Sequence, residues 1–153
     1  MVELYYLPLY LDMGIDQTEL PGLSIHLPPR RAHRSRSQDI LLSLITPFGG
    51  TQPANRLLES MQSEAAGVYY GSRGSVTSAM RSAAEHFNDL FLKYNAHLQG
   101  NRKDGQIFGY LNMAVLRGDV LFLLHVGATS SFLLRPDEFQ HFQEGSARGR
   151  GLG

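Results

Sequence analysis

Residues 114–135, AVLRGDVLFLLHVGATSSFLLR, decide how the second half of the chain folds. Three apolar runs of strand length follow one another around this segment: residues 108–116, 120–126 and 132–135. Gly118-Asp119 is a favoured two-residue hairpin turn, and residues 127–131 form a second polar turn. We therefore expect an antiparallel meander of three strands. The second turn is either a plain hairpin turn or a former catalytic site that no longer carries a charged catalytic group.

The chain upstream of this meander predicts two helices. Apolar side chains recur at spacings of three and four across residues 76–98, with Ser75 as N-cap and Gly100 as a C-terminal stop. An earlier helix is expected to start at Thr51 as its cap, with Pro53 in its first turn. Three glycines are expected to break the chain between the helices: Gly67, Gly71 and Gly74.

The N-terminal part predicts further strands. Residues 2–13 alternate, with an apolar face of Leu7, Leu9, Leu11 and Met13, while Pro8 favours an edge position. Residues 23–27 predict a short strand, and residues 40–45, ILLSLI, predict a strand buried on both faces. A turn is expected at TPFGG, residues 46–50. Because strands cluster apart from helices, the predicted fold is α+β, with helices packed outside antiparallel sheets.

Composition limits the classes of function. The 153 residues are 42% hydrophobic and 18% charged, as in an ordinary globular domain, and the formal net charge is zero. No global field therefore attracts nucleic acid or an anionic membrane. The absence of cysteine excludes disulfides and thiolate metal sites, and no apolar run approaches the roughly 18 residues of a membrane span. Since the start also lacks the basic region of a signal peptide, we expect a cytoplasmic protein without membrane contact.

Residues 30–39, RRAHRSRSQD, are the one dense basic segment. They predict a solvated loop or an arginine that contacts a phosphate, since a guanidinium matches phosphate oxygens. A nucleic-acid-binding module that uses residues 30–36 is a further alternative, although no aromatic residues are interleaved there. His86 is not expected to bind metal, because no second ligand lies three or four positions away.

The order of these segments resembles the metal-dependent protein serine/threonine phosphatases of the 2C type, the PPM family. In that family a Gly-Asp turn, an apolar strand, Val-Gly-Asp-Ser-Arg and an aromatic, apolar strand follow one another, and residues 114–135 match this order without gaps. Arg34 with Ser37-Gln38-Asp39 matches the family's Arg-x-x-Asn-Glu/Gln-Asp segment. ITPFGG falls at its Ala-Asp-Gly-Met-Gly-Gly turn, and GRGLG near the C-terminus resembles its Arg-x-Leu-Gly element.

The resemblance implies a domain organisation. It covers residues 23–153, which we expect to form a phosphatase 2C-like domain, a partial α-β-β-α sandwich that is incomplete at the C-terminus. Residues 1–22 are expected to be an N-terminal strand extension. Because the family's last strands would cover apolar surface that stays open here, we expect self-association or a protein partner.

The resemblance also implies a degenerate metal site. The family binds two Mg²⁺ or Mn²⁺ ions, which need carboxylate ligands. Its bridging aspartate corresponds to Thr46, its backbone-carbonyl ligand to Pro47, and the aspartate of Val-Gly-Asp-Ser-Arg to Ala128. Asp39 is left as a candidate outer-shell carboxylate and Arg34 as a candidate phosphate contact. We expect no cofactor, and Mg²⁺ or Mn²⁺ only if the site is functional after all.

These losses predict a catalytically inactive pseudophosphatase that acts as a scaffold or protein-interaction module. An alternative is an active metal-dependent serine/threonine phosphatase that uses displaced ligands or is completed by another chain.

Overall fold

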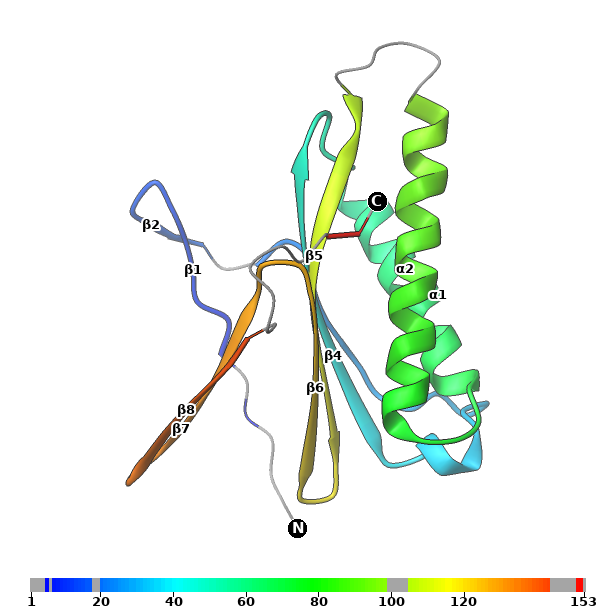
Figure 1. Ribbon diagram of the computed structural model, residues 1–153, viewed down its shortest axis with the longest axis vertical. Coiled ribbons are helices and arrows are strands. Elements are labelled where there is room, and N and C mark those ends of the chain that lie inside the picture. Colours follow the sequence, from blue (N-terminus) through cyan, green and yellow to red (C-terminus); the bar gives the residue numbers. More distant parts are fainter. Residues whose placement is uncertain (1–4, 6, 18–19, 99–104, 144–150, 153) are drawn as a thin grey trace.

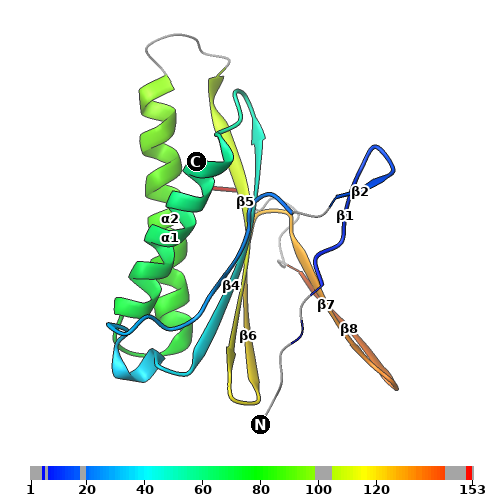
Figure 2. The same ribbon diagram turned by 180° about the vertical axis from the view of Figure 1, so that it is seen from behind.

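The computed structural model describes residues 5, 7–17, 20–98, 105–143 and 151–152. A four-stranded antiparallel sheet packs against two helices that cover one of its faces (Figures 1 and 2). The strand order is β3 (Leu23–His26), β4 (Asp39–Gly49), β5 (Ile107–Arg117) and β6 (Val120–Val126). The helices are α1 (Asn55–Gly71) and α2 (Val76–Leu98). The α+β class with external helices is therefore confirmed.

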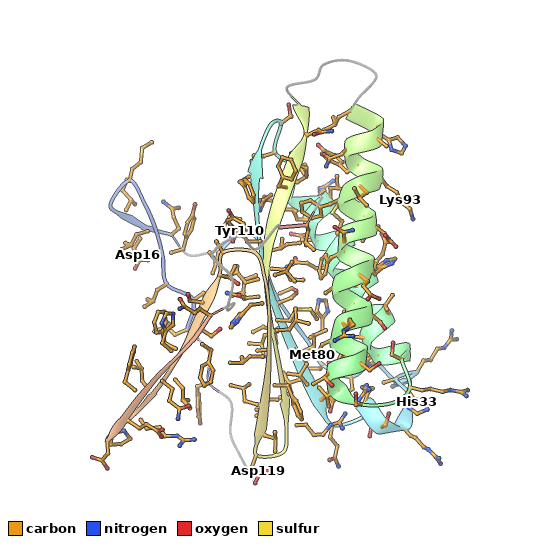
Figure 3. All side chains as sticks on the ribbon, in the orientation of Figure 1. Asp16, His33, Met80, Lys93, Tyr110 and Asp119 are labelled. Atoms are coloured by element: carbon orange, nitrogen blue, oxygen red, sulfur yellow. The ribbon has the colours of Figure 1, made fainter. Side chains whose placement is uncertain are left out.

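The core lies between the helices and the long central strands. Leu41 and Ile45 of β4, and Leu111 and Val115 of β5, are buried toward the helices. The predicted stripe of α2 fills the other side: Val76, Met80, Ala83, Ala84, Phe87 and Phe91 are buried. In Figure 3, Met80 lies between α2 and the sheet. The alternate side chains of β4 are only half buried, so the expected burial of residues 40–45 on both faces is wrong: the helices cover one face alone.

The second helix begins as predicted and the first does not. The Ser75 hydroxyl accepts a hydrogen bond from the Ser78 N–H at 3.1 Å, which is N-cap geometry. In contrast, α1 starts at Asn55, so Thr51 and Pro53 lie outside the helix. Ala54, the residue before it, makes no side-chain cap hydrogen bond. Gly67 lies inside α1 and does not break it, because tertiary packing overrides its weak helix propensity.

The turn predicted at residues 46–50 is wrong, because β4 continues through Thr46 and Pro47 to Gly49. The geometry of the sheet allows this proline. The Ile45 N–H donates to the Gly22 carbonyl at 2.9 Å, on the β3 side of the strand. The Pro47 nitrogen faces the same side two residues later, beyond the end of β3, so no ladder hydrogen bond is lost there.

The predicted three-stranded meander is also wrong. β5 and β6 form the expected hairpin, but β7 (Ser130–Arg135) pairs with β8 (Glu138–Gln143) in a separate two-stranded sheet. Gly127, at a φ of 82°, turns the chain out of the main sheet before β7 begins. The strand β8 was not predicted, since its glutamate and glutamines hide its strand pattern. Figures 1 and 2 show β7 and β8 on the side of the main sheet away from the helices.

The N-terminal segment forms a small hairpin in place of one long strand. β1 (Tyr10–Asp12) pairs with β2 (Ile15–Gln17) across a turn at Met13 and Gly14, with φ of 49° and 79°. These values define a type I′ turn, which reverses the chain within two residues. The predicted apolar face is exposed: Leu7, Leu9, Leu11 and Met13. Residues 2–4 and 6 of the predicted strand lie outside the described residues.

The C-terminal tail contacts the main sheet at Leu152. Leu152 is buried and pairs with Gly109 of β5 through two backbone hydrogen bonds of 3.0 and 2.7 Å. Residues 144–150 and Gly100, the predicted helix stop, lie outside the described residues. Within the described part of the chain, neither helix is long and apolar enough to cross a membrane.

Candidate functional site

Two of the predicted site positions lie at one end of the main sheet. Thr46 of β4 pairs with Tyr110 of β5, and Gly127 follows directly after the pair that joins Val126 to Leu111. A Cβ atom on Gly127 would lie 2.3 Å from Cδ1 of Tyr110, so the glycine is pressed against this ring. Thr46 and the turn that contains Ala128 therefore flank Tyr110 from opposite sides.

This end of the sheet offers little that could bind a cation. Thr46 supplies a hydroxyl and Ala128 a methyl group, and both side chains are exposed. Pro47 contributes its ring, and Phe48 packs on Tyr110 with ring centroids 4.4 Å apart. Hard divalent ions need several oxygen ligands, mostly carboxylates. Among the residues that the structure describes, no group of three His, Cys, Asp or Glu side chains could hold a metal ion.

Asp39 and Arg34 lie at the other end of β4. Asp39 is seven residues from Thr46 along the strand, or roughly 23 Å at about 3.3 Å per residue. Arg34 is exposed in a short 3₁₀ turn, Arg34–Arg36, that precedes β4. The structure thus brings Thr46, Pro47 and Ala128 together at one end of the sheet, and Arg34 and Asp39 together at the other.

The Asp39 carboxylate is buried, and both of its oxygens have partners. Arg117 donates to Oδ1 from Nε at 2.6 Å and to Oδ2 from Nη2 at 2.7 Å. The Tyr69 hydroxyl donates to Oδ2 at 2.5 Å, and Nη1 of the buried Arg36 lies 3.8 Å from the same oxygen. A carboxylate with these partners closes an internal charge network and leaves no oxygen for a metal ion.

The electrostatics of this network favour the ionised carboxylate. Burial alone would raise the pKa of Asp39, but hydrogen bonds from Arg117 and Tyr69 outweigh it and hold the pKa below its usual value. Burial, together with the bond to Asp39, raises the pKa of Tyr69 above its usual value, so this phenol stays a donor. The hydrogen bond to Asp39 likewise raises the pKa of Arg117.

The network joins five parts of the chain: the 3₁₀ turn Arg34–Arg36, β4, α1, the start of α2 and β5. Arg36 also donates from Nη2 to the carbonyls of Gly74 and Ser75, at 2.9 and 2.6 Å, where α2 begins. Arg36 is fully buried, so the basic segment of residues 30–36 is not a solvated patch throughout: one of its arginines is an internal structural element.

Arg36, Tyr69 and Arg117 were not predicted from the sequence as partners of Asp39. A signal for one of them existed: aligning the apolar runs of β4 and β5 antiparallel places Asp39 opposite Arg117, as the observed register does. Nothing in the local sequence distinguishes Arg36 from its exposed neighbours.

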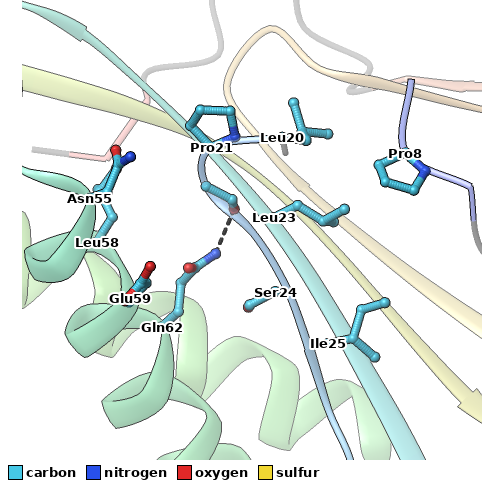
Figure 4. A pocket seen from close by; sticks show the side chains of 11 residues that line it. Pro8, Leu20, Pro21, Leu23, Ser24, Ile25, Asn55, Leu58, Glu59 and Gln62 are labelled. Atoms are coloured by element: carbon cyan, nitrogen blue, oxygen red, sulfur yellow. Dashed lines mark hydrogen bonds between the residues drawn. The ribbon is translucent and has the colours of Figure 1, made fainter. Parts of the chain in front are cut away.

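A cavity of about 410 Å³ lies between β3, α1 and the chain before β3 (Figure 4). The Gln62 side-chain amide donates to the Gly22 carbonyl at its wall. Among the described residues that line it, Glu59 alone is charged, and a single carboxylate does not make a divalent-cation site.

The fold resembles solved structures of PP2C-type serine/threonine phosphatases. A bacterial serine phosphatase variant matches with a TM-score of 0.58 over 88% of this chain and 59% of its own length, at 9% identity. The PstP/Ppp phosphatase of Mycobacterium tuberculosis gives 0.51, over 80% and 52%, at 18% identity. The serine/threonine phosphatase of S. agalactiae gives 0.52, over 88% and 53%, at 17% identity.

The described architecture is thus a partial PP2C-type fold, as the order of the sequence segments predicted. The chain spans between 52 and 59% of the length of these three phosphatases. No model of a known protein family matches the sequence, and no curated protein matches it. At these low identities the likeness is one of fold, and the chemistry must be argued from the residues of this chain.

Proposed function

We propose that this chain is a phosphatase-fold domain that does not catalyse phosphate hydrolysis and acts in protein recognition inside the cell. The observation that carries the proposal is the pair of positions around Tyr110. Thr46 and Ala128 occupy one end of the sheet, where the resembled family places aspartates, and neither supplies a carboxylate. Without carboxylates, two dications cannot be held there to activate a water molecule.

The contacts of Asp39 also support the absence of phosphate hydrolysis. Asp39 is the carboxylate that the resemblance offers as an outer ligand, and it is bound by Arg117 and Tyr69 at the far end of β4. Recruiting it would leave the buried Arg36 without its counter-ion, which is costly. The hydrophobic core of the fold is present, while the positions of the metal ligands differ from those of the resembled family. This combination favours a role in which the surface of the domain binds another protein.

The direct test is hydrolysis of p-nitrophenyl phosphate by the purified chain with Mn²⁺ or Mg²⁺. We expect a rate no higher than that of the metal ion without protein. Metal-dependent turnover would instead support an active phosphatase with displaced ligands or one completed by another chain. Asp39→Asn then locates the activity: a loss of turnover with retained folding would assign a catalytic role to Asp39, against our proposal.

A nucleic-acid-binding role gains no support from the basic loop. Burial of Arg36 removes one of its four arginines from the surface, leaving Arg30, Arg31 and Arg34 exposed. Phosphate binding by three arginines would weaken steeply with salt. An electrophoretic shift of single-stranded RNA that disappears at moderate salt would revive this alternative.

A further inference from the structure

β6 is an unusually unprotected edge strand. It is the last strand of the four-stranded sheet, and among the described residues it pairs with β5 alone. Its sequence, VLFLLHV, contains no Lys, Arg, Asp, Glu or Pro. Native edge strands usually carry such residues, because exposed backbone N–H and C=O groups pair readily with another strand.

The register defines which groups of β6 face outward. A two-residue turn joins β5 to β6, so the flanking pair of Arg117 and Val120 is directed inward across the hairpin. Backbone groups alternate in direction along a strand. Those of Phe122 and Leu124 therefore face β5, and those of Leu121 and Leu123 face the open edge.

Both faces of this edge are hollowed. On the helix side, a cavity of about 390 Å³ is lined by Leu124, Val126 and Leu152 and by polar side chains of α2, among them Arg81, Glu85 and Asp89. On the other side, a cavity of about 830 Å³ between β6 and β7 is lined by Leu121, Leu123 and Phe132, among others. A strand added to β6 would direct alternate side chains into these two cavities, which is how strand addition gains specificity.

The chain itself carries a segment that fits this edge. Leu7, Leu9, Leu11 and Met13 alternate along the N-terminal segment and are exposed, although they are apolar. The type I′ turn directs the backbone groups of Tyr10 toward β2, so those of Leu9 and Leu11 point to the free edge of the hairpin. Pro8, which lacks an N–H, has the same parity as Tyr10 and does not interrupt that free edge.

We propose that the β6 edge of one copy binds the β1–β2 hairpin of a second copy by antiparallel or parallel strand addition. Within one copy the hairpin and β6 lie apart, as both views show (Figures 1 and 2). The net charge of zero leaves no long-range repulsion between identical chains. This inference deepens the proposed function, on which it rests, because it names the surface and the partner for protein recognition.

Sedimentation velocity of the full chain at micromolar concentrations tests the proposal. Leu11→Lys and Leu121→Lys each place a charge on one side of the contact, and we expect each to raise the dimer dissociation constant at least about tenfold. Matched controls are Leu27→Lys and Leu92→Lys. Leu27 is 68% exposed against 69% for Leu11, and Leu92 is 48% exposed against 51% for Leu121. A monomeric wild type, or equal weakening by the controls, overturns the proposal.

Cysteine cross-linking gives a second measurement, since the chain has no cysteine. A mixture of Leu11→Cys and Leu121→Cys proteins should form a mixed disulfide on mild oxidation several times faster than a mixture of Leu27→Cys and Leu121→Cys. Equal rates would overturn the proposal. A monomer without metal-dependent hydrolysis would reject this dimer and leave the proposed function intact. A dimer that hydrolyses phosphate in the presence of metal would support the contact and reject the proposed function.

Discussion

The carboxylate of Asp39 is the counter-ion that two guanidinium groups, those of Arg36 and Arg117, share inside the protein. Removing its charge leaves Arg36 buried beside Tyr69 without a counter-ion, 5.3 Å from the centre of that ring. The sequence marked Asp39 as notable only through a family resemblance. Its partner Arg117 is 78 positions away, so the contact follows from the antiparallel alignment of β4 with β5 and from no local pattern around Asp39.

Asp39→Asn should lower the free energy of unfolding by about 3 kcal/mol, because it breaks a buried ion pair on one side only. Urea unfolding followed by circular dichroism measures this change. The matched control is Asp89→Asn on the exposed face of α2, for which we expect a change within about 0.5 kcal/mol. Equal losses in the two variants would show that Asp39 has no special structural role.

The pH dependence follows from the lowered pKa of Asp39. Since the unfolded carboxyl titrates near about 3.9, the unfolded state binds the proton more readily, and stability rises with pH in this window. The contribution of Asp39 is therefore complete above the unfolded pKa and is lost as the pH falls through the folded one. Unfolding curves of wild type and Asp39→Asn should converge in acid. A constant difference down to acid pH would contradict this assignment.

At the scale of elements, helix α2 could be predicted because one continuous apolar stripe and one capping serine specify it locally. The continuation of β4 through Thr46 and Pro47 could not be predicted locally, because the end of β3 creates the position that tolerates Pro47. The pairing of β7 with β8 was missed for a related reason. The polar side chains of β8 hide its strand pattern, and the partner of β7 is set by the direction in which Gly127 turns the chain.

Ser75→Ala should destabilise the protein by about 1 kcal/mol, because the Ser78 N–H loses its acceptor at the start of α2. Thermal and urea unfolding both report this loss. The control is Ser78→Ala in the same turn, which keeps the cap and introduces a better helix former. If Ser78→Ala destabilises as much as Ser75→Ala, the cap does not define the start of this helix.

At the scale of the whole molecule, a helix pair on one face of an antiparallel sheet places this chain among PP2C-type folds. The order and spacing of segments were sufficient to predict that likeness, although they did not predict the separate sheet of β7 and β8. The resemblance also predicts that Thr46 and Ala128 stand where the family has metal-binding aspartates. Their common location around Tyr110 required the sheet register, which pairs Thr46 with Tyr110, more than sixty positions away, and Leu111 with Val126.

Calorimetric titration of Mn²⁺ into the full chain tests most directly whether the fold lacks its metal site. The matched variant carries Thr46→Asp, Pro47→Gly and Ala128→Asp, which restore two carboxylates and a flexible backbone carbonyl around Tyr110. We predict no binding in the micromolar range for the wild type and measurable affinity in the variant. Micromolar binding of Mn²⁺ by the wild-type chain would contradict the account.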